Sequence, residues 1–182
     1  GLAYAQAEDT WDVLQNTIPY YRGTAGGLFG PDGARSDFLV HWLNLWGTLD
    51  ARYEQDLSPA TRRYVEAFAA GFNQFAADHP QRVTLDILPI TGKDIVAAHM
   101  LRHLFFYGFD KTVKAILGEN QAKPVSPPPV VAQPHQPTGS NAIAVGPTRS
   151  SDGSTMLVIN PHQPLTGPVA WYEAHVQSDE GL

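Results

Sequence analysis

The spacing of hydrophobic residues predicts a helical first part of the chain. Apolar residues recur at helical intervals from residue 2 to about residue 18, and Pro19 predicts the end of that helix. The glycine-rich residues 20–37 predict a flexible loop between two helices. Because a phosphate-binding loop joins a strand to a helix, this loop is not expected to bind a nucleotide.

Three more helices follow from the same periodicity. One begins at Ser36 or Asp37 and ends at Leu49, and its two tryptophans, Trp42 and Trp46, lie four residues apart on one face, which predicts core positions.

The next helix has a clear start in the sequence. Ser58 is predicted as its N-cap and Pro59 as its first residue, and the apolar pattern continues to Asp78. A further helix is predicted to begin at Thr91 or Gly92.

The composition then changes. Residues 121–138 contain six prolines, which disfavour helix and central strand and predict an extended linker or excisable spacer. Beyond it the period becomes strand-like, over residues 141–145, 155–159 and 169–176, with Asp152-Gly153 as the hairpin turn.

Charge and composition narrow the classes of function. The net charge is −6, and Lys and Arg form no basic stripe, so no nucleic-acid partner is predicted. The chain contains no run of about 18 apolar residues, so no membrane-spanning helix is predicted. The absence of cysteine excludes disulfides and thiolate metal sites.

Three sequence blocks resemble one enzyme family. Residues 139–162 read GSNAIAVGPTRSSDGSTMLVINPH, residues 1–11 read GLAYAQAEDTW, and residues 58–75 read SPATRRYVEAFAAGFNQF. In this order they resemble the two-chain junction and two helices of the penicillin, cephalosporin and acyl-homoserine-lactone acylases. The family is that of the penicillin acylases, which are N-terminal-nucleophile hydrolases, and the chain resembles part of an uncleaved precursor.

The resemblance implies an α+β fold. It divides the chain into a helical α-chain-like region at 1–120, a Pro-rich linker or spacer at 121–139, and the start of a β-chain-like core at 140–182. That last part is expected to supply the first strands of an incomplete αββα core.

The resemblance also implies the chemistry. Ser140 is expected to attack the Gly139 carbonyl, so that autoproteolysis at Gly139-Ser140 makes Ser140 an N-terminal nucleophile whose amine serves as base. Asn141 is expected to help fix the processing turn, and His162 to assist Ser140. The alternatives remain a turn-capping serine and a hydrogen-bonded loop histidine.

A substrate pocket is the other expected site. Phe105, Phe106 and Tyr107 match the part of the family's helix that lines the acyl pocket, although plain core packing is the simpler interpretation. The remaining histidines show no HExxH or other ligand spacing, so neither a metal nor a cofactor is predicted; they stand at positions 41, 79, 99, 103, 135 and 175.

The expected function is therefore that of an amidohydrolase acting on a small-molecule acyl amide, with the remainder of its own acylase chain as partner. The chain begins inside a predicted helix, which suggests a missing N-terminus. The resemblance implies a periplasmic or secreted protein, whose export signal would precede Gly1. This segment alone is expected to be inactive. The alternative is a truncated non-catalytic fragment or binding domain derived from an acylase.

Overall fold

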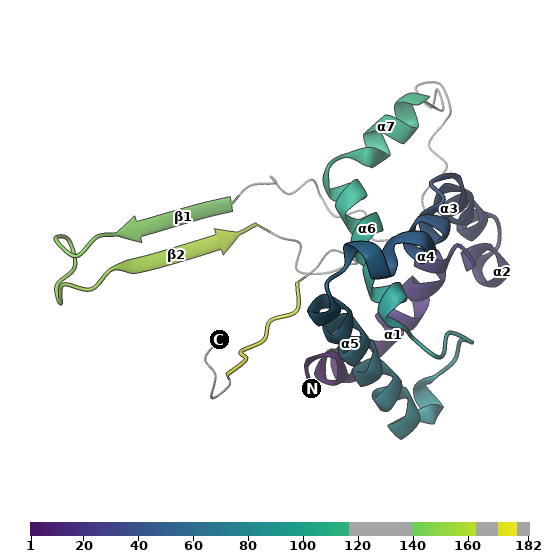
Figure 1. Ribbon diagram of the computed structural model, residues 1–182, viewed down its shortest axis with the longest axis horizontal. Helices are drawn as coiled ribbons and strands as arrows, with labels where there is room; N and C mark the ends of the chain where they lie inside the picture. Colours follow the sequence, from purple (N-terminus) through teal and green to yellow (C-terminus); the bar gives the residue numbers. More distant parts are fainter. Residues whose placement is uncertain (117–139, 163–170, 178–182) are drawn as a thin grey trace. The chain divides into compact units, whose positions relative to one another are not determined.

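The computed structural model describes residues 1–116, 140–162 and 171–177. The chain divides into two compact units, one of residues 1–128 and 176–182 and the other of residues 129–175. The first is helical and the second contains a β-hairpin (Figure 1).

The first helix, α1 (Leu2–Arg22), continues beyond Pro19, so the predicted stop at that proline is wrong. Pro19 is fully buried in the interior of the unit, and this packing compensates for the backbone hydrogen bond that a proline cannot donate. The helix is instead broken at Thr10, where φ is −130°, and it ends at Gly23, whose φ of 70° favours glycine.

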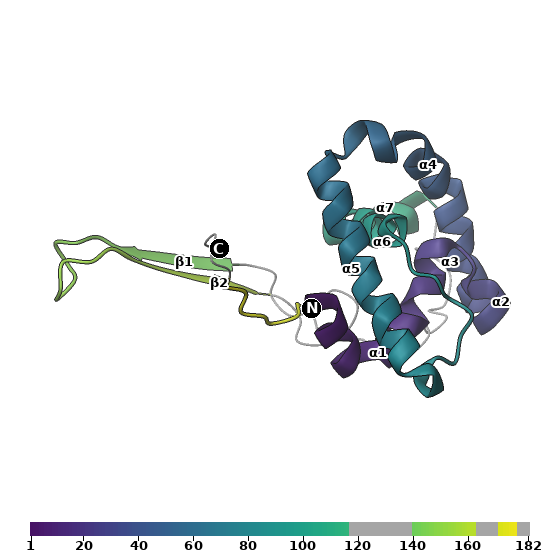
Figure 2. The ribbon, with the colours of Figure 1, turned by 60° about the horizontal axis from the view of Figure 1, so that its bottom comes forward.

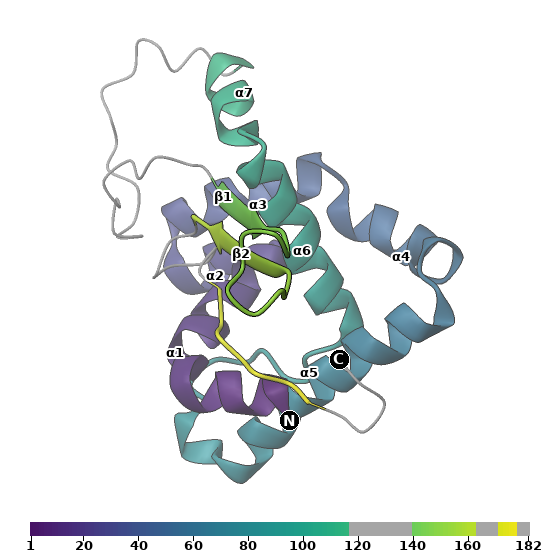
Figure 3. The ribbon, with the colours of Figure 1, turned by 90° about the vertical axis from the view of Figure 1, so that its left-hand side faces the viewer.

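The predicted flexible loop at residues 20–37 is also wrong, because most of it is helical. It holds α2 (Ala25–Phe29) and the first half of α3 (Pro31–Trp42), which pack together (Figure 3). Asp37, which projects from α3, accepts hydrogen bonds from the backbone N–H groups of Ala25 and Gly26 at 2.8 and 2.7 Å. These bonds satisfy free donors at the start of α2.

The helix predicted to end at Leu49 is two helices. Asn44, with a left-handed φ of 48°, separates α3 from α4 (Leu45–Asp56). The break separates the two tryptophans: Trp42 is 55% exposed, so its predicted core position is wrong. Trp46 is half-buried and its Nε1 donates to the Tyr21 carbonyl at 2.9 Å.

The predictions for the next two helices are confirmed. Ser58 Oγ accepts the backbone N–H of Thr61 at 3.1 Å, as an N-cap should. The elements that follow are α5 (Pro59–Asp78), the short 3₁₀ helix η1 (Pro80–Arg82), α6 (Gly92–Phe106) and α7 (Phe109–Ile116).

The core of the helical unit has two clusters. One joins α1 and α5, which lie side by side (Figure 2), and includes Trp11, Phe72 and Phe75. The other joins α3, α4, α5 and α6 around Val40 and Leu101. Among the described helices, none is long and apolar enough to cross a membrane.

Side chains hold the irregular connection between η1 and α6. Gln15 Oε1 accepts the N–H of Thr84 at 3.0 Å, and Trp11 Nε1 donates to the Arg82 carbonyl at 3.0 Å. Asn73 accepts from the N–H of Ile90 at 2.8 Å and donates to its carbonyl at 2.7 Å. The connection therefore has hydrogen-bond partners without belonging to a sheet.

The second unit contains an antiparallel hairpin of β1 (Ser140–Val145) and β2 (Met156–Pro161). These strands confirm two of the three predicted ones. The connection covers residues 146–155, so the turn is longer than Asp152-Gly153 alone. The third predicted strand is wrong over residues 171–176, which are not in a strand.

Helices together with an antiparallel sheet make the chain α+β, as predicted. Residues 121–138, the predicted linker, lie outside the described residues. The proposed boundaries beside it, and hence the division into 1–120, 121–139 and 140–182, stay a prediction.

Candidate active site at the start of the hairpin

Ser140 is the first residue of β1, and its side chain is exposed. The strand register pairs it with Pro161, the last residue of β2. Gly139, the other residue of the predicted cleavage bond, lies outside the described residues. The structure thus places the predicted nucleophile at an accessible end of an ordered strand.

Asn141 and His162 meet on one face of the hairpin. Asn141 pairs with Asn160 in the register, and His162 is two residues beyond Asn160. Because residues two apart on a strand share a face, His162 is the diagonal neighbour of Asn141. The Nδ2 atom of Asn141 lies 3.2 Å from Nε2 of His162, a hydrogen-bond distance.

The same alternation places Ser140 on the opposite face from its neighbour Asn141. In the described hairpin the His162 ring is hydrogen-bonded to Asn141, and not to the Ser140 hydroxyl. The structure therefore brings together two of the predicted site residues, Asn141 and His162. The third, Ser140, is adjacent in sequence but is oriented to the other side.

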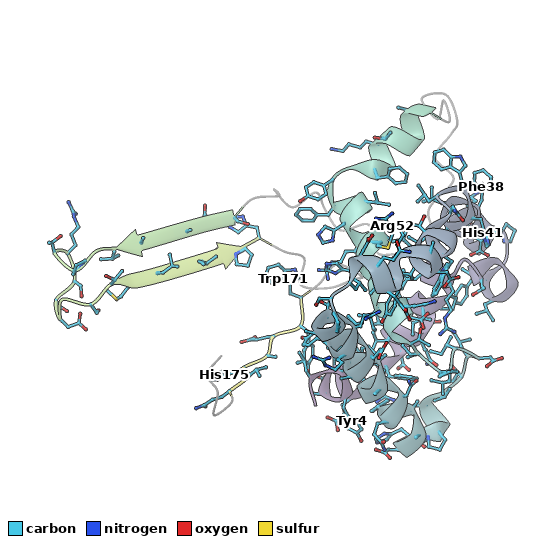
Figure 4. The ribbon with its side chains drawn as sticks, in the orientation of Figure 1. Tyr4, Phe38, His41, Arg52, Trp171 and His175 are labelled. Atoms are coloured by element: carbon cyan, nitrogen blue, oxygen red, sulfur yellow. The ribbon has the colours of Figure 1, made fainter. Side chains whose placement is uncertain are left out.

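The apolar positions of the hairpin are exposed on both faces, and their side chains extend from either side of the ribbon (Figure 4). Ile143 and Val158 share the face of Asn141 and are 61% and 60% exposed. Leu157 and Ile159 share the face of Ser140 and are 63% and 64% exposed. A two-stranded ribbon of this kind is marginally stable by itself.

The hairpin connection is organised by one carboxylate. The hydroxyl groups of Ser150 and Ser154 and the backbone N–H of Ser154 all donate to Oδ1 of Asp152. These hydrogen bonds, with that of Ser150 the largest cause, lower the pKa of Asp152. Gly153, between Asp152 and Ser154, has a φ of 77°, the left-handed conformation that favours glycine. The sequence signal Asp152-Gly153 therefore marked a real bend.

The predicted substrate-pocket residues belong to the helical unit. Phe106 ends α6 and is 61% exposed, and Tyr107 follows it and is 79% exposed. Core packing, the simpler interpretation, is therefore wrong for these two residues. The side chain of Phe105 lies outside the described residues. A pocket role for the three stays a prediction.

A surface hollow of about 430 Å³ lies between α5 and the start of α6, beside Tyr53, Glu66 and Lys93. It contains none of the predicted site residues. Within the described ranges, no group of three or more His, Cys, Asp or Glu side chains could hold a metal ion.

The whole sequence was compared with known proteins. The model of the penicillin amidase family matches residues 1–181. The chain belongs to the penicillin amidase family. This match includes both the helical unit and the hairpin, and therefore also Ser140 and His162.

Curated relatives of this family member align with nearly all of its length. It is 28% identical over 205 residues to the acyl-homoserine lactone acylase PvdQ of Pseudomonas syringae pv. syringae B728a. It is 29% identical over 205 residues to PvdQ of Pseudomonas syringae pv. tomato DC3000, and 29% over 202 residues to that of Pseudomonas fluorescens Pf0-1. Each alignment covers 97% of the chain and 26% of the relative, so the chain spans about a quarter of their length.

The sequence analysis of this penicillin amidase family member did not predict the contact between Asn141 and His162. It treated Asn141 and His162 as separate elements of a motif. The two predicted strands and their approximate register would have placed them diagonally on one face, because 141 and 160 had only to be paired.

Proposed function

We propose that the protein is the precursor of an amidohydrolase that uses Ser140 as an N-terminal nucleophile. The supporting observation is the position of Ser140, which is exposed at the first residue of a paired strand in a chain of the penicillin amidase family. The hairpin would then supply the first strands of an N-terminal-nucleophile αββα core. The helical unit would contribute Phe105, Phe106 and Tyr107 to the acyl pocket.

The first step is processing. The Oγ of Ser140 attacks the carbonyl carbon of Gly139, the bond from that carbon to the Ser140 nitrogen breaks, and an ester forms. Water then hydrolyses the ester, which leaves the Gly139 carboxylate and a free amine on Ser140. Glycine before the bond leaves the carbonyl unshielded, which suits this attack.

The second step is amide hydrolysis. The freed α-amine of Ser140, whose reference pKa is roughly 7.7–8.0, accepts the proton of its own hydroxyl. The Oγ attacks the substrate carbonyl, the leaving amine takes the proton, and water hydrolyses the resulting acyl ester. Before processing the nitrogen is an amide that cannot serve as a base, so the precursor is inactive.

The substrate class is proposed from the relatives. Their printed names are those of acyl-homoserine lactone acylases, so an N-acyl-homoserine lactone is the first substrate to test. The remainder of the acylase chain is the proposed partner, since this chain spans 26% of those relatives. We also propose export to the periplasm or outside the cell.

The test uses the full-length protein that carries this chain, with Ser140→Ala beside it and Ser150→Ala as a matched control. Intact mass should show two fragments split at Gly139-Ser140 for the parent and for Ser150→Ala, and one uncut chain for Ser140→Ala. Chromatography with mass detection should show release of homoserine lactone only from the two processed proteins. Amide hydrolysis by Ser140→Ala, or a cut elsewhere, would refute the proposal.

The alternative, a non-catalytic fragment or binding domain, has a different outcome in the same experiment. It predicts an uncut parent protein that releases no lactone under conditions where a processed relative does. Measuring the parent and an active relative side by side therefore separates the two functions.

A further inference from the structure

A hydrogen bond joins the side-chain amide of Asn141 to one ring nitrogen of His162. The Nδ2 atom of Asn141 lies 3.2 Å from Nε2 of His162. An amide nitrogen donates hydrogen bonds and does not accept them, so Nε2 must be the acceptor. A neutral imidazole with an accepting Nε2 carries its hydrogen on Nδ1.

We propose that Asn141 is a positioning residue that holds His162 in the Nδ1-protonated tautomer. The proposal rests on the proposed function and says which group of that same site acts as donor and which as base. With Nε2 engaged by Asn141 and Nδ1 carrying a proton, the ring has no free lone pair. His162 is then a hydrogen-bond donor and not a base, and the α-amine of Ser140 is the base.

The geometry that supports this assignment comes from the hairpin. Asn141 is held at its place by the strand register, opposite Asn160. His162 follows the last residue of β2, so its ring lies diagonally across from Asn141 at a distance that side chains of this length can bridge. Both residues belong to the hairpin region, and the contact is present in the uncleaved chain.

The orientation of Ser140 agrees with a role for His162 as donor and not as base. Its side chain belongs to the opposite face of the hairpin, so the His162 ring does not hold the hydroxyl in the uncleaved chain. The ring is therefore not placed to act as the base for Ser140 in the uncleaved chain, whereas processing would create an amine at Ser140 itself.

The tautomer can be measured directly. Protein labelled with ¹⁵N-histidine is studied by solid-state NMR, in which the two ring nitrogens have separate shifts when protonated and unprotonated. His162→Gln identifies the signals by their loss, and Ser140→Ala keeps the precursor uncut. We expect the Nδ1-protonated form in both the precursor and the processed protein.

Three variants test the role of Asn141. In Asn141→Leu, which removes the amide, the ring should shift toward the Nε2-protonated form that free histidine prefers. In Asn141→Asp the carboxylate only accepts, so Nε2 should be protonated while the contact is kept. Asn160→Leu, the matched change on the facing strand, should leave the tautomer unchanged.

Kinetics supply the second measurement. In the processed enzyme, Asn141→Leu should lower kcat about ten-fold with KM within about two-fold, and Asn141→Gln should recover most of the loss. Asn160→Leu should keep the parent kcat.

An Nε2-protonated ring in the parent protein, or an unchanged tautomer in Asn141→Leu, overturns this inference even if Ser140 proves to be the nucleophile. An unchanged kcat in Asn141→Leu overturns it as well. Conversely, amide hydrolysis that survives Ser140→Ala refutes the proposed function, whatever the tautomer measurement shows.

Discussion

Arg22 and Asp94 form a two-point ion pair that ties the last turn of α1 to the first turn of α6. The Nε of Arg22 lies 2.7 Å from Oδ1 of Asp94, and its terminal nitrogen donates to Oδ2 at 3.0 Å. Thr91 also donates to Oδ2 through its N–H and its hydroxyl, both at 2.8 Å. The Asp94 side chain is 4% exposed, so this carboxylate on α6 is buried where it joins α1, through Arg22, and the connection before α6, through Thr91.

Removing the charge of Asp94 should destabilise the helical unit strongly. Asp94→Asn leaves the guanidinium of Arg22 beside a neutral amide, and breaking a buried pair in this way costs about 3 kcal/mol. Urea unfolding followed by circular dichroism measures the change. The control is Asp56→Asn, which breaks the exposed pair with Arg52 at 2.7 Å and should cost less than about 1 kcal/mol. Equal losses in the two variants would contradict the importance of burial.

The same pair makes stability depend on acid. Burial by itself would raise the pKa of Asp94, but hydrogen bonds from Arg22 and Thr91 outweigh it, so the pKa is lowered. Because the folded pKa lies below the unfolded value of about 3.9, the stabilisation is present above that pH and is lost as pH falls through the folded pKa. The stability difference between the parent and Asp94→Asn should therefore be constant from pH 7 to about 5 and shrink below about pH 4. A difference that grows in acid would contradict this sign.

Two glycines of the α2–α3 pair should respond in opposite ways to alanine. A Cβ at Gly33 would collide with the backbone of Ala25, whereas a Cβ at Gly27 would meet nothing within 4 Å. Gly33→Ala should therefore cost about 1–3 kcal/mol, because two backbones must separate. Gly27→Ala should stabilise the protein by about 0.5–1 kcal/mol, because alanine suits a helix interior better than glycine. Thermal unfolding of both variants gives the comparison, and a loss in Gly27→Ala equal to that in Gly33→Ala would count against the close approach.

Asn73 should be more important than its neighbour on α5. Asn73→Leu removes both hydrogen bonds to Ile90 and leaves that backbone N–H and carbonyl without their partner, which should cost about 2–3 kcal/mol. Gln74→Leu removes an exposed hydrogen bond to Asp78 and should change stability by less than about 0.5 kcal/mol. Denaturant unfolding of the two variants tests the difference, and a loss in Gln74→Leu as large as that in Asn73→Leu would be the contrary result.

The sequence predicted the elements that depend on near neighbours. The start of α5 follows from Ser58 and Pro59, because an N-cap and a proline at the first helical position act within one turn. The start of α2 depends on Asp37, which is more than ten residues away, so the glycine-rich stretch gave only the signal of a loop. The predicted helix end at Pro19 is wrong for a similar reason, because the spacing of nearby residues does not show that Pro19 is buried.

The arrangement of the candidate site depends on the strand register, which the sequence analysis did not use. The resemblance identified Ser140, Asn141 and His162 in one block of sequence. The alternation of faces along β1 is what separates Ser140 from the other two, and it depends on the register with β2. The positions of Trp42 and Trp46 could not be predicted from spacing either. The left-handed Asn44 between them breaks the helix, so the two tryptophans do not share a face as they would in a continuous helix.

The connection from η1 to α6 owes its path to side chains that lie elsewhere in the sequence. Gln15 and Asn73 act on it as a neighbouring strand would, bonding the backbone at Thr84 and Ile90. Since these bonds are made to main-chain atoms, they do not depend on which side chains the connection carries. Natural variants and library designs should therefore tolerate exchange at its exposed positions, such as Asp86, while the two anchoring amides on α1 and α5 should resist it.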